Sequence, residues 1–282
     1  MDTHTLEPVI VTAERPGGSR SFVVRSYQAW NWLGLQTLIQ REVRRFLKVW
    51  QQTLIGPLMS TLLFMMVFSF AFPNRNWSDT AMPYAWGLAP GLIMLGILTN
   101  AFQNTSSSMV QAKLMGISID FLMPPISSVE LTIAFITGAV IRGIAVGIAS
   151  VAAVAAFANV IPVHPFVAVY YAFIAAVIFA AIGLIGGIWA EKFDHIAAFT
   201  TFVITPLTML SGTFYSVDAL PPALSFLLHW NPVFFLIDGF RYGFIGEAHS
   251  DLLTGVLFTG ALAVGLSWGA WAMLKSGYGL KA

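Results

Sequence analysis

One arginine inside an apolar stretch is the residue of this sequence best placed to carry chemistry. Arg142 lies near the middle of a stretch long enough to cross a membrane. A charged side chain at that depth costs about 2.5–3.5 kcal/mol on insertion scales, so it should face a helix interface or a wet cavity. It would either clamp the register of two helices or take a direct part in moving a solute. Its candidate partners are Asn100, Gln103 and Asn104, or, if the stretch is shifted inward, Asp120 and Glu130.

The three amides lie near one end of the preceding apolar stretch, next to Thr105, and their spacing predicts one helix. They could line an entrance or hold helices together. The second role is the commoner one, because amides hydrogen-bond well across pairs of membrane helices.

Acidic and histidine side chains form no pattern typical of an enzyme. Asp194 and His195 are adjacent, but two acids and one histidine in residues 191–195 lack the further ligand that a zinc site needs. The sequence contains no Gly-x-x-x-x-Gly-Lys-Ser/Thr or His-Glu-x-x-His motif, and no Gly-x-Ser-x-Gly pattern in a context that supports a hydrolase. We therefore expect no catalytic residue, no metal and no nucleotide bound by this chain. The nearest other histidines are predicted on the opposite membrane face: His164, His229 and His249.

Composition places most of the chain in lipid. Of the 282 residues, 57% are hydrophobic and 10% are charged, whereas a soluble domain carries about 25% charged residues. So little charge cannot cover a surface that faces water. A net charge of +1 without a basic face argues against a nucleic-acid partner. The absence of cysteine excludes disulfides and thiolate ligands, and no secretory signal peptide is expected at the start.

Six apolar spans follow one another, each long enough for the ~20 residues that cross a bilayer core. Before the last span, residues 215–240 are apolar but interrupted by three prolines, which predicts short re-entrant helices at the outer face. The expected fold is an all-α membrane protein with six transmembrane helices in one domain, residues 51–282. The spans cover residues 54–72, 84–106, 131–159, 166–190, 196–214 and 252–274.

Two segments precede the spans. Residues 1–26 mix charges with proline and glycine and are expected to form a polar cytoplasmic tail. Residues 27–50 predict an amphipathic helix that lies in the membrane interface or packs on another subunit. Its apolar face holds Leu35, Leu38, Ile39, Val43, Phe46 and Trp50, and its polar face holds Gln36, Gln40, Arg41, Arg44, Arg45 and Lys48.

The distribution of lysine and arginine predicts the orientation, because these residues favour cytoplasmic loops. With the N-terminus inside, only Arg75 and Arg241 fall outside, so both termini are expected in the cytoplasm. The inward set is Arg15, Arg20, Arg25, Arg41, Arg44, Arg45, Lys48, Lys113, Lys192, Lys275 and Lys281.

A spaced pattern of proline, glycine and aromatic residues marks the C-terminal part. It resembles the bacterial ABC-type-2 export permeases, most closely their YadH-like inner-membrane subgroup, and the resemblance extends from about Ala29 onward. It implies the permease of an ATP-driven exporter in the bacterial inner membrane, a homodimer with two ATPase subunits that bind ATP and Mg. The cargo implied is a lipid, a glycolipid or polysaccharide, or a drug. The pattern comprises Phe193-Asp, Thr205-Pro-Leu-Thr, Phe214-Tyr-Ser, Leu220-Pro-Pro, Asn231-Pro and Gly239-Phe-Arg-Tyr-Gly-Phe.

The resemblance also assigns roles to residues. Segment 111–127 corresponds to the family's coupling helix, which seats in the ATPase, although Met115 stands where the family often has an acidic residue. The expected coupling residues are Lys113, Leu114, Gly116, Ile117, Asp120 and Phe121. Spans two and five of the family line its central path. With Arg142 added, the candidate path or gate residues are Asn100, Gln103, Asn104, Arg142, Thr205, Thr208, Phe214 and Tyr215.

Two other classes of protein stay open. A passive channel or secondary transporter would need buried carboxylates for ion coupling, and the six expected spans contain none. A membrane-embedded lipid-modifying enzyme would need His, Asp or Glu clustered at one interface, and these residues are scattered over both. Co-purification with an ATPase would separate the exporter from both rivals.

Overall fold

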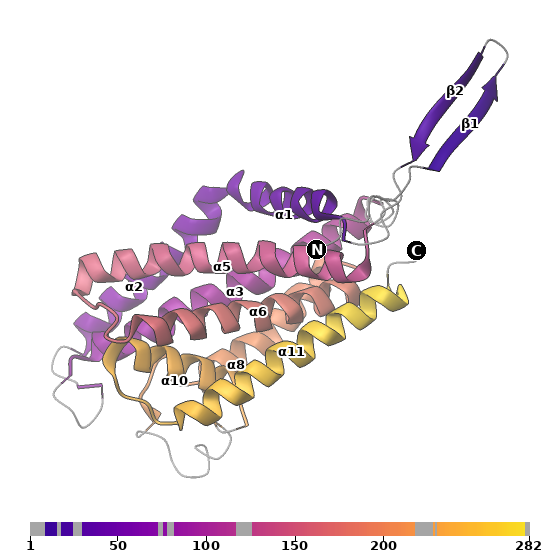
Figure 1. Ribbon diagram of the computed structural model, residues 1–282. Coiled ribbons are helices and arrows are strands. Elements are labelled where there is room, and N and C mark those ends of the chain that lie inside the picture. The colour runs from indigo at the N-terminus through magenta and orange to yellow at the C-terminus, as the bar shows by residue number, and fades with distance from the viewer. Residues whose placement is uncertain are drawn as a thin grey trace.

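The computed structural model is a bundle of long helices, and it describes residues 9–15, 18–24, 30–72, 76–77, 82–116, 126–217, 228 and 230–279. A two-stranded antiparallel hairpin, β1 (Val9–Arg15) and β2 (Gly18–Val24), stands apart from the bundle (Figure 1). Only a polar tail was expected there. The run Val-Ile-Val-Thr of β1 is rich in β-branched residues and is the signal for a strand that was missed.

Six helical segments in the described part of the chain are long and apolar enough to cross a membrane, which confirms the predicted spans. Successive segments run in opposite directions, so their connections alternate between the two ends of the bundle (Figure 1). The spans are η1 (Gln51–Ile55) with α2 (Gly56–Ala71), then α3 (Tyr84–Leu114), α5 (Ser128–Ala158), α6 (Pro165–Trp189), the run of α7 (Phe193–Phe199), η2 (Thr200–Ile204) and α8 (Thr205–Leu210), and α11 (Leu252–Ser276).

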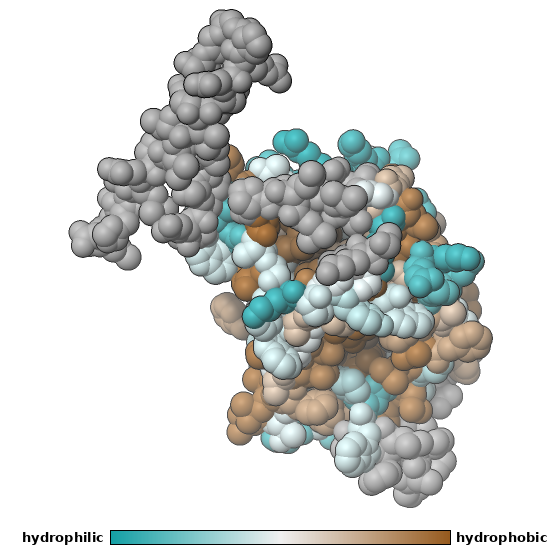
Figure 2. All heavy atoms as spheres, turned by 90° about the vertical axis from the view of Figure 1, so that its right-hand side faces the viewer, coloured by the Kyte–Doolittle hydropathy of each residue, from teal (hydrophilic) through white to brown (hydrophobic). Residues whose placement is uncertain are grey.

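Two further helices are too short to span. α1 (Trp32–Leu47) lies against α5, and α10 (Pro232–Ile245) packs on α6 and α3. The end of the bundle that holds the start of α1 and the end of α11 faces the viewer in Figure 2. Hydrophilic side chains are spread over this end, and hydrophobic side chains predominate along the flanks.

The helix α3 occupies the centre of the bundle, with α2, α5, α6 and α10 packed around it. Most of its side chains are buried. Contact with α6 is close because glycines replace side chains there: a Cβ on Gly183 would lie 2.3 Å from Thr105 Oγ1, and one on Gly187 would lie 2.8 Å from Met109 Cβ. These two glycines therefore form a packing surface between the helices. Gly186, next to Gly187, has no such close neighbour.

The short helix α10 uses the same device against α6. A Cβ on Gly239 would lie 2.1 Å from the Tyr171 ring, and one on Gly243 would lie 2.7 Å from the Ala168 nitrogen. Between them stands Arg241, which is fully buried and donates to the Gly212 and Gly87 carbonyls at 2.5 and 3.2 Å. The orientation count predicts that this arginine lies on the outer side of the membrane. Its guanidinium ties α10 to α3 and to the turn after α8.

A buried carboxylate joins α10 to the loop before α11. Asp238 is fully buried and accepts hydrogen bonds from the backbone nitrogens of His249 and Ser250 at 3.0 and 2.8 Å and from the Ser250 hydroxyl at 2.7 Å. Burial alone would raise the pKa of this carboxyl, but the hydrogen bonds from His249 and Ser250 outweigh it and hold the pKa below its usual value of 3.8. The charged form therefore stabilises the fold.

We expect Asp238→Asn to lower the free energy of unfolding by about 2 kcal/mol, because the amide presents hydrogens to groups that donate. The contribution of Asp238 should be complete at neutral pH and should disappear as the pH falls below 3.8, the usual value, through the lowered pKa. Thermal unfolding of the full chain in a neutral detergent measures both effects. Asp251→Asn, at the exposed N-cap of α11, is the control and should cost less. Equal losses in the two variants would contradict this account of Asp238.

Candidate functional site

A groove of about 1190 Å³ runs along one side of α3. One wall is formed by the end of α1, η1 and α2, the other by α7, η2 and α8, and α5 contributes Arg142. Away from its two ends, between residues 87 and 112, α3 has five positions that its neighbours leave partly or fully uncovered; they recur every four residues and so form one stripe of the helix. All five line the groove: Leu95, Thr99, Gln103, Ser107 and Gln111.

Polarity changes along this stripe. Towards the α1 end the lining is cationic and hydrogen-bonding, with Arg45, Lys48 and Gln52 on one wall. Towards the other end the lining is uncharged, with Phe64 of α2, Leu92 of α3 and Met209 of α8 beside the hydroxyl side chains Ser60, Thr61, Thr205 and Thr208. The groove is therefore amphipathic along its length.

Each wall contains one turn of π-helix, η1 in the first span and η2 in the fifth. Side chains of both turns line the groove, among them Gln52 and Thr53 from η1 and Thr200 and Thr201 from η2. The Thr205 hydroxyl donates to the Thr200 carbonyl at 3.0 Å. Single π turns within α-helices are frequent at functional sites, and hydrophobic periodicity did not predict these two.

Arg142 meets one of its predicted partners in this groove. Its Nη2 and Nε donate to Asn100 Oδ1 at 3.0 and 3.3 Å, joining α5 to α3. Asn100 in turn donates to the Gly96 carbonyl at 3.0 Å. Glu130, another candidate, is used elsewhere: its carboxylate completes a capping box with Ser127 at the start of α5 and accepts from the Asn31 backbone. Asp120 lies outside the described residues.

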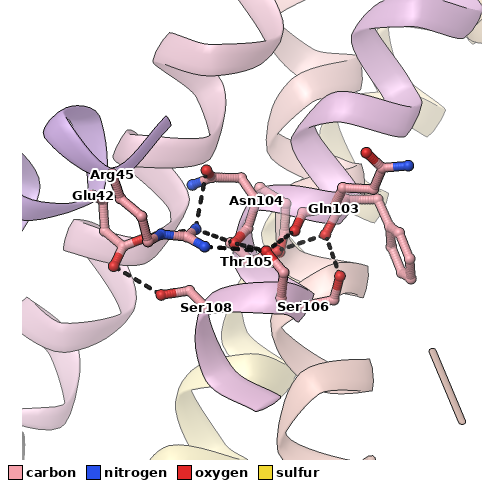
Figure 3. A network of polar contacts seen from close by, with 10 residues as sticks. Glu42, Arg45, Gln103, Asn104, Thr105, Ser106 and Ser108 are labelled. Carbon is pink, nitrogen blue, oxygen red and sulfur yellow. Dashed lines mark hydrogen bonds and ion pairs between the residues drawn. The ribbon is translucent and has the colours of Figure 1, made fainter. Parts of the chain in front are cut away.

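A second arginine, which the sequence pattern assigned to the polar face of the N-terminal amphipathic helix, also points into the bundle. Arg45 donates to the carbonyl and Oδ1 of Asn104 at 2.6 and 3.1 Å and to Ser107 Oγ at 3.1 Å (Figure 3). It forms an ion pair of 3.0 Å with Glu42, which is fully buried and accepts from Ser108 at 2.8 Å. The network fixes α1 to α3, and Glu42 was missed because it interrupts the apolar face of an amphipathic helix.

The predicted path residues divide into two groups. The groove is lined by Asn100, Gln103, Arg142, Thr205 and Thr208. Asn104, Phe214 and Tyr215 lie outside its lining. The ring of Phe214 packs edge-on against Phe64 at 5.7 Å, and the Tyr215 hydroxyl donates to the Leu210 carbonyl at 2.6 Å, so both close the turn after α8.

Only part of the predicted coupling segment is described. Lys113 is bent back onto the end of α6, where its ammonium donates to the carbonyls of Ile188 and, at 2.8 Å, Ala190. A cation suits this position because carbonyls at a helix C-terminus are left without partners. Leu114 is exposed, and Gly116 follows with a φ of 69°, which favours glycine and ends the helix. Ile117, Asp120 and Phe121 lie outside the described residues.

Asp194 and His195 lie in the first turn of α7, directly after a short bend at residues 191–192. The Glu191 backbone nitrogen lies 3.4 Å from His195 Nδ1, and the His195 ring packs on Trp189 at 5.5 Å. The helices α5 and α7 start earlier than the predicted spans, so Glu130 and Asp194 stand in their first turns. This corrects the expectation that the spans hold no carboxylate, but both acids lie at helix ends.

Comparison with known proteins places the chain among transport proteins. Residues 34–245 match the family model for ABC-2 type transporters. The chain is 36% identical to the inner membrane transport permease YadH of Escherichia coli K12 over 254 residues, which is 89% of this chain and 98% of that protein. It is also 29% identical to nodulation protein J of Neorhizobium galegae over 129 residues, 45% of this chain and 46% of that protein.

We expect the Arg142–Asn100 contact to appear as a coupling energy of about 1–3 kcal/mol in a double-mutant cycle of Arg142→Leu and Asn100→Leu, because it is a hydrogen bond to a charged group. The measurement is the free energy of unfolding in mixed micelles. Arg142→Lys should rescue the single variant only in part, since the planar fork is lost.

The control is a second cycle that uses Gln103 in the place of Asn100. Gln103 lines the same groove, but its side chain does not form the hydrogen bonds that Arg142 donates to Asn100. Gln103→Leu combined with Arg142→Leu should give a coupling near zero. The contact is absent in the membrane protein if the two cycles give the same coupling.

Proposed function

The chain belongs to the ABC-2 type transporter family, and from this premise we propose that it is the transmembrane subunit of an ATP-driven exporter of amphipathic molecules. It is a multi-pass protein of the inner membrane, with six helices that can cross a bilayer. In the proposal, two copies pair and two ATPase subunits bind beneath them, holding the ATP and Mg that this chain has no motif to bind.

The amphipathic groove along α3 is the observation that supports this proposal most directly. Its lining changes from charged at the α1 end to apolar at the other, and it combines residues from the second and fifth spans. A molecule with a polar head and an apolar body would find matching surfaces at both ends. Its apolar body would bury apolar area at one end, and its polar head would meet charged and hydrogen-bonding side chains at the other. The groove is the proposed substrate path.

Work from the ATPase would reach the groove through α3. The proposed coupling segment, 111–127, continues directly from the helix whose exposed stripe forms the groove floor. Because α3 is packed on four neighbours, a displacement of its end would move the floor against both walls. The same helix therefore joins the proposed ATPase contact to the proposed path.

The rival classes lack matching features. The charged groups that line the groove are the cations Arg45, Lys48 and Arg142, so the lining has no carboxylate to carry a proton or sodium ion. Within the described residues there is no cluster of three His, Asp or Glu side chains of the kind that would bind a metal. An exporter driven by a separate ATPase accounts for these features better.

The proposal predicts both termini in the cytoplasm. Reporter fusions after Ala81, His164 and Glu247 should report the periplasm, and fusions after Ser118 and Ala282 the cytoplasm, because lysine and arginine concentrate on the second side. Alkaline phosphatase and a fluorescent protein that matures only in the cytoplasm give opposite signals and control for each other. A periplasmic signal at Ala282 would refute the orientation.

The proposal also predicts that a P-loop ATPase co-purifies with the tagged chain and that its turnover in proteoliposomes depends on the coupling segment. Truncating one interface anchor costs about 1–4 kcal/mol, so Phe121→Ala and Ile117→Asp should release the ATPase or uncouple hydrolysis from export. Both variants should still insert and fold, as judged by gel filtration.

Leu253→Ala is the control for the coupling variants, because this exposed leucine lies at the start of α11, at the opposite end of the bundle. It should retain the ATPase and normal turnover. Normal ATPase binding and export in Phe121→Ala and Ile117→Asp would exclude this segment as the coupling element. The absence of any co-purified ATPase would argue against the exporter itself.

A further inference from the structure

We infer that the groove selects amphiphiles whose head group is an oxyanion, of the phosphate or carboxylate kind, and that Lys48 and Arg142 bind it. The inference rests on the proposed function, since it names the substrate class of the proposed path. Its basis is the imbalance of charge in the groove together with the donors that remain without partners.

Among the residues that the structure describes, the groove lining contains three cations and no carboxylate. Arg45 is neutralised by Glu42 at 3.0 Å and is held by α3. Lys48 and Arg142 make no ion pair with any part of the chain that the structure describes. Asp194 follows the lining residue Phe193 but does not itself line the groove. Two positive charges are thus left uncompensated beside an apolar channel, where an anion would be attracted most strongly.

Both uncompensated cations keep donors available. Arg142 donates hydrogen bonds from Nε and Nη2 to Asn100, and its Nη1 has no hydrogen-bond partner among the described residues. Lys48 is exposed at the end of α1, and its ammonium makes no hydrogen bond within the described residues. A guanidinium edge and an ammonium are the groups that proteins use to hold phosphate and carboxylate oxygens.

The cations line the same groove. Arg45 binds Asn104 and Arg142 binds Asn100, and four residues of α3 rise by about 6 Å, so the two guanidiniums stand one turn apart. Lys48 follows Arg45 by three residues and lines the same groove. Gln103, exposed on the stripe between them, adds an amide that can donate to the same anion.

An apolar section begins directly beyond the cations. From Asn100 to Leu92 the helix rises about 12 Å, and the walls at that level carry Phe64 and Met209. A free anion would leave this section empty, whereas the chain of an amphiphile would bury apolar surface in it. The geometry therefore favours an anionic head joined to an apolar tail over a small inorganic anion.

Binding of dodecyl phosphate to the purified full-length chain in phosphatidylcholine nanodiscs tests the inference without the ATPase, so its result is independent of whether an ATPase partner exists. We expect saturable binding with a shift of the unfolding midpoint. Dodecyltrimethylammonium at the same concentration should produce neither effect, and inorganic phosphate should bind much more weakly.

Lys48→Gln and Arg142→Gln should each raise the dissociation constant of dodecyl phosphate by roughly tenfold, the loss expected for one charged hydrogen bond. Arg44→Gln, which removes an exposed cation of α1 outside the groove, should leave it unchanged. Lys48→Gln decides the question if Arg142→Gln does not fold, because Lys48 makes no contact that the fold needs.

Three results would overturn the inference. Equal binding of the cationic and anionic probes would show that the groove does not select its ligand by charge. Equal binding of inorganic phosphate and dodecyl phosphate would remove the role of the apolar section. A dissociation constant that is unchanged in Lys48→Gln, and also in Arg142→Gln if that variant folds, would place the bound probe elsewhere.

Discussion

The need to pair charged and amide groups inside a lipid-embedded bundle shapes this structure, and α3 is where that need is greatest. This helix carries two amides, Asn100 and Asn104, at its centre, and neither is exposed to solvent. Each receives a guanidinium from a different neighbour, one from α5 and one from α1. An unpaired amide or arginine is costly inside the membrane. These contacts therefore fix the axial position and the rotation of α5 and α1 relative to α3. The groove exists because these same contacts leave one stripe of α3 uncovered.

Close packing around α3 and α10 follows from glycine. Gly183 and Gly187 face α3 and Gly243 faces α6 at positions where the neighbouring backbone comes close, and at Gly239 the Tyr171 ring of α6 lies in the space that a side chain would need. In lipid there is little hydrophobic gain from helix association, so such contacts supply much of the attraction that holds the bundle together. The buried groups of α10, Asp238 and Arg241, then add directional bonds to that contact.

The order and length of the spans could be predicted because hydrophobic length is a local property of the sequence. The partner of Arg142 was among those proposed, since helical spacing placed Asn100 within reach. The inward rotation of Arg45 could not be predicted, because it depends on Glu42 being buried against Ser108, and an amphipathic pattern assigns both charges to the polar side. The uncovered stripe of α3, whose residues recur every four positions, was likewise missed. It mixes leucine, threonine, glutamine and serine, and it is defined by what neighbouring helices leave open rather than by its own composition.

The turn η2 has a consequence for how the fifth span tolerates insertions and deletions. A π turn holds one residue more than the α-helix around it, and each residue of an α-helix advances the direction of the side chain by about 100°. Removing a single residue from Thr200–Ile204 would let a regular α turn replace the π turn, and the helix before and after it would keep nearly the same facing. Ala197 and Thr208, which lie on either side of the turn and both line the groove, would still face the same way. A deletion in the α-helical part of the span would instead rotate one side of the groove lining by about 100° against the other, although many span lengths would suffice to cross the bilayer.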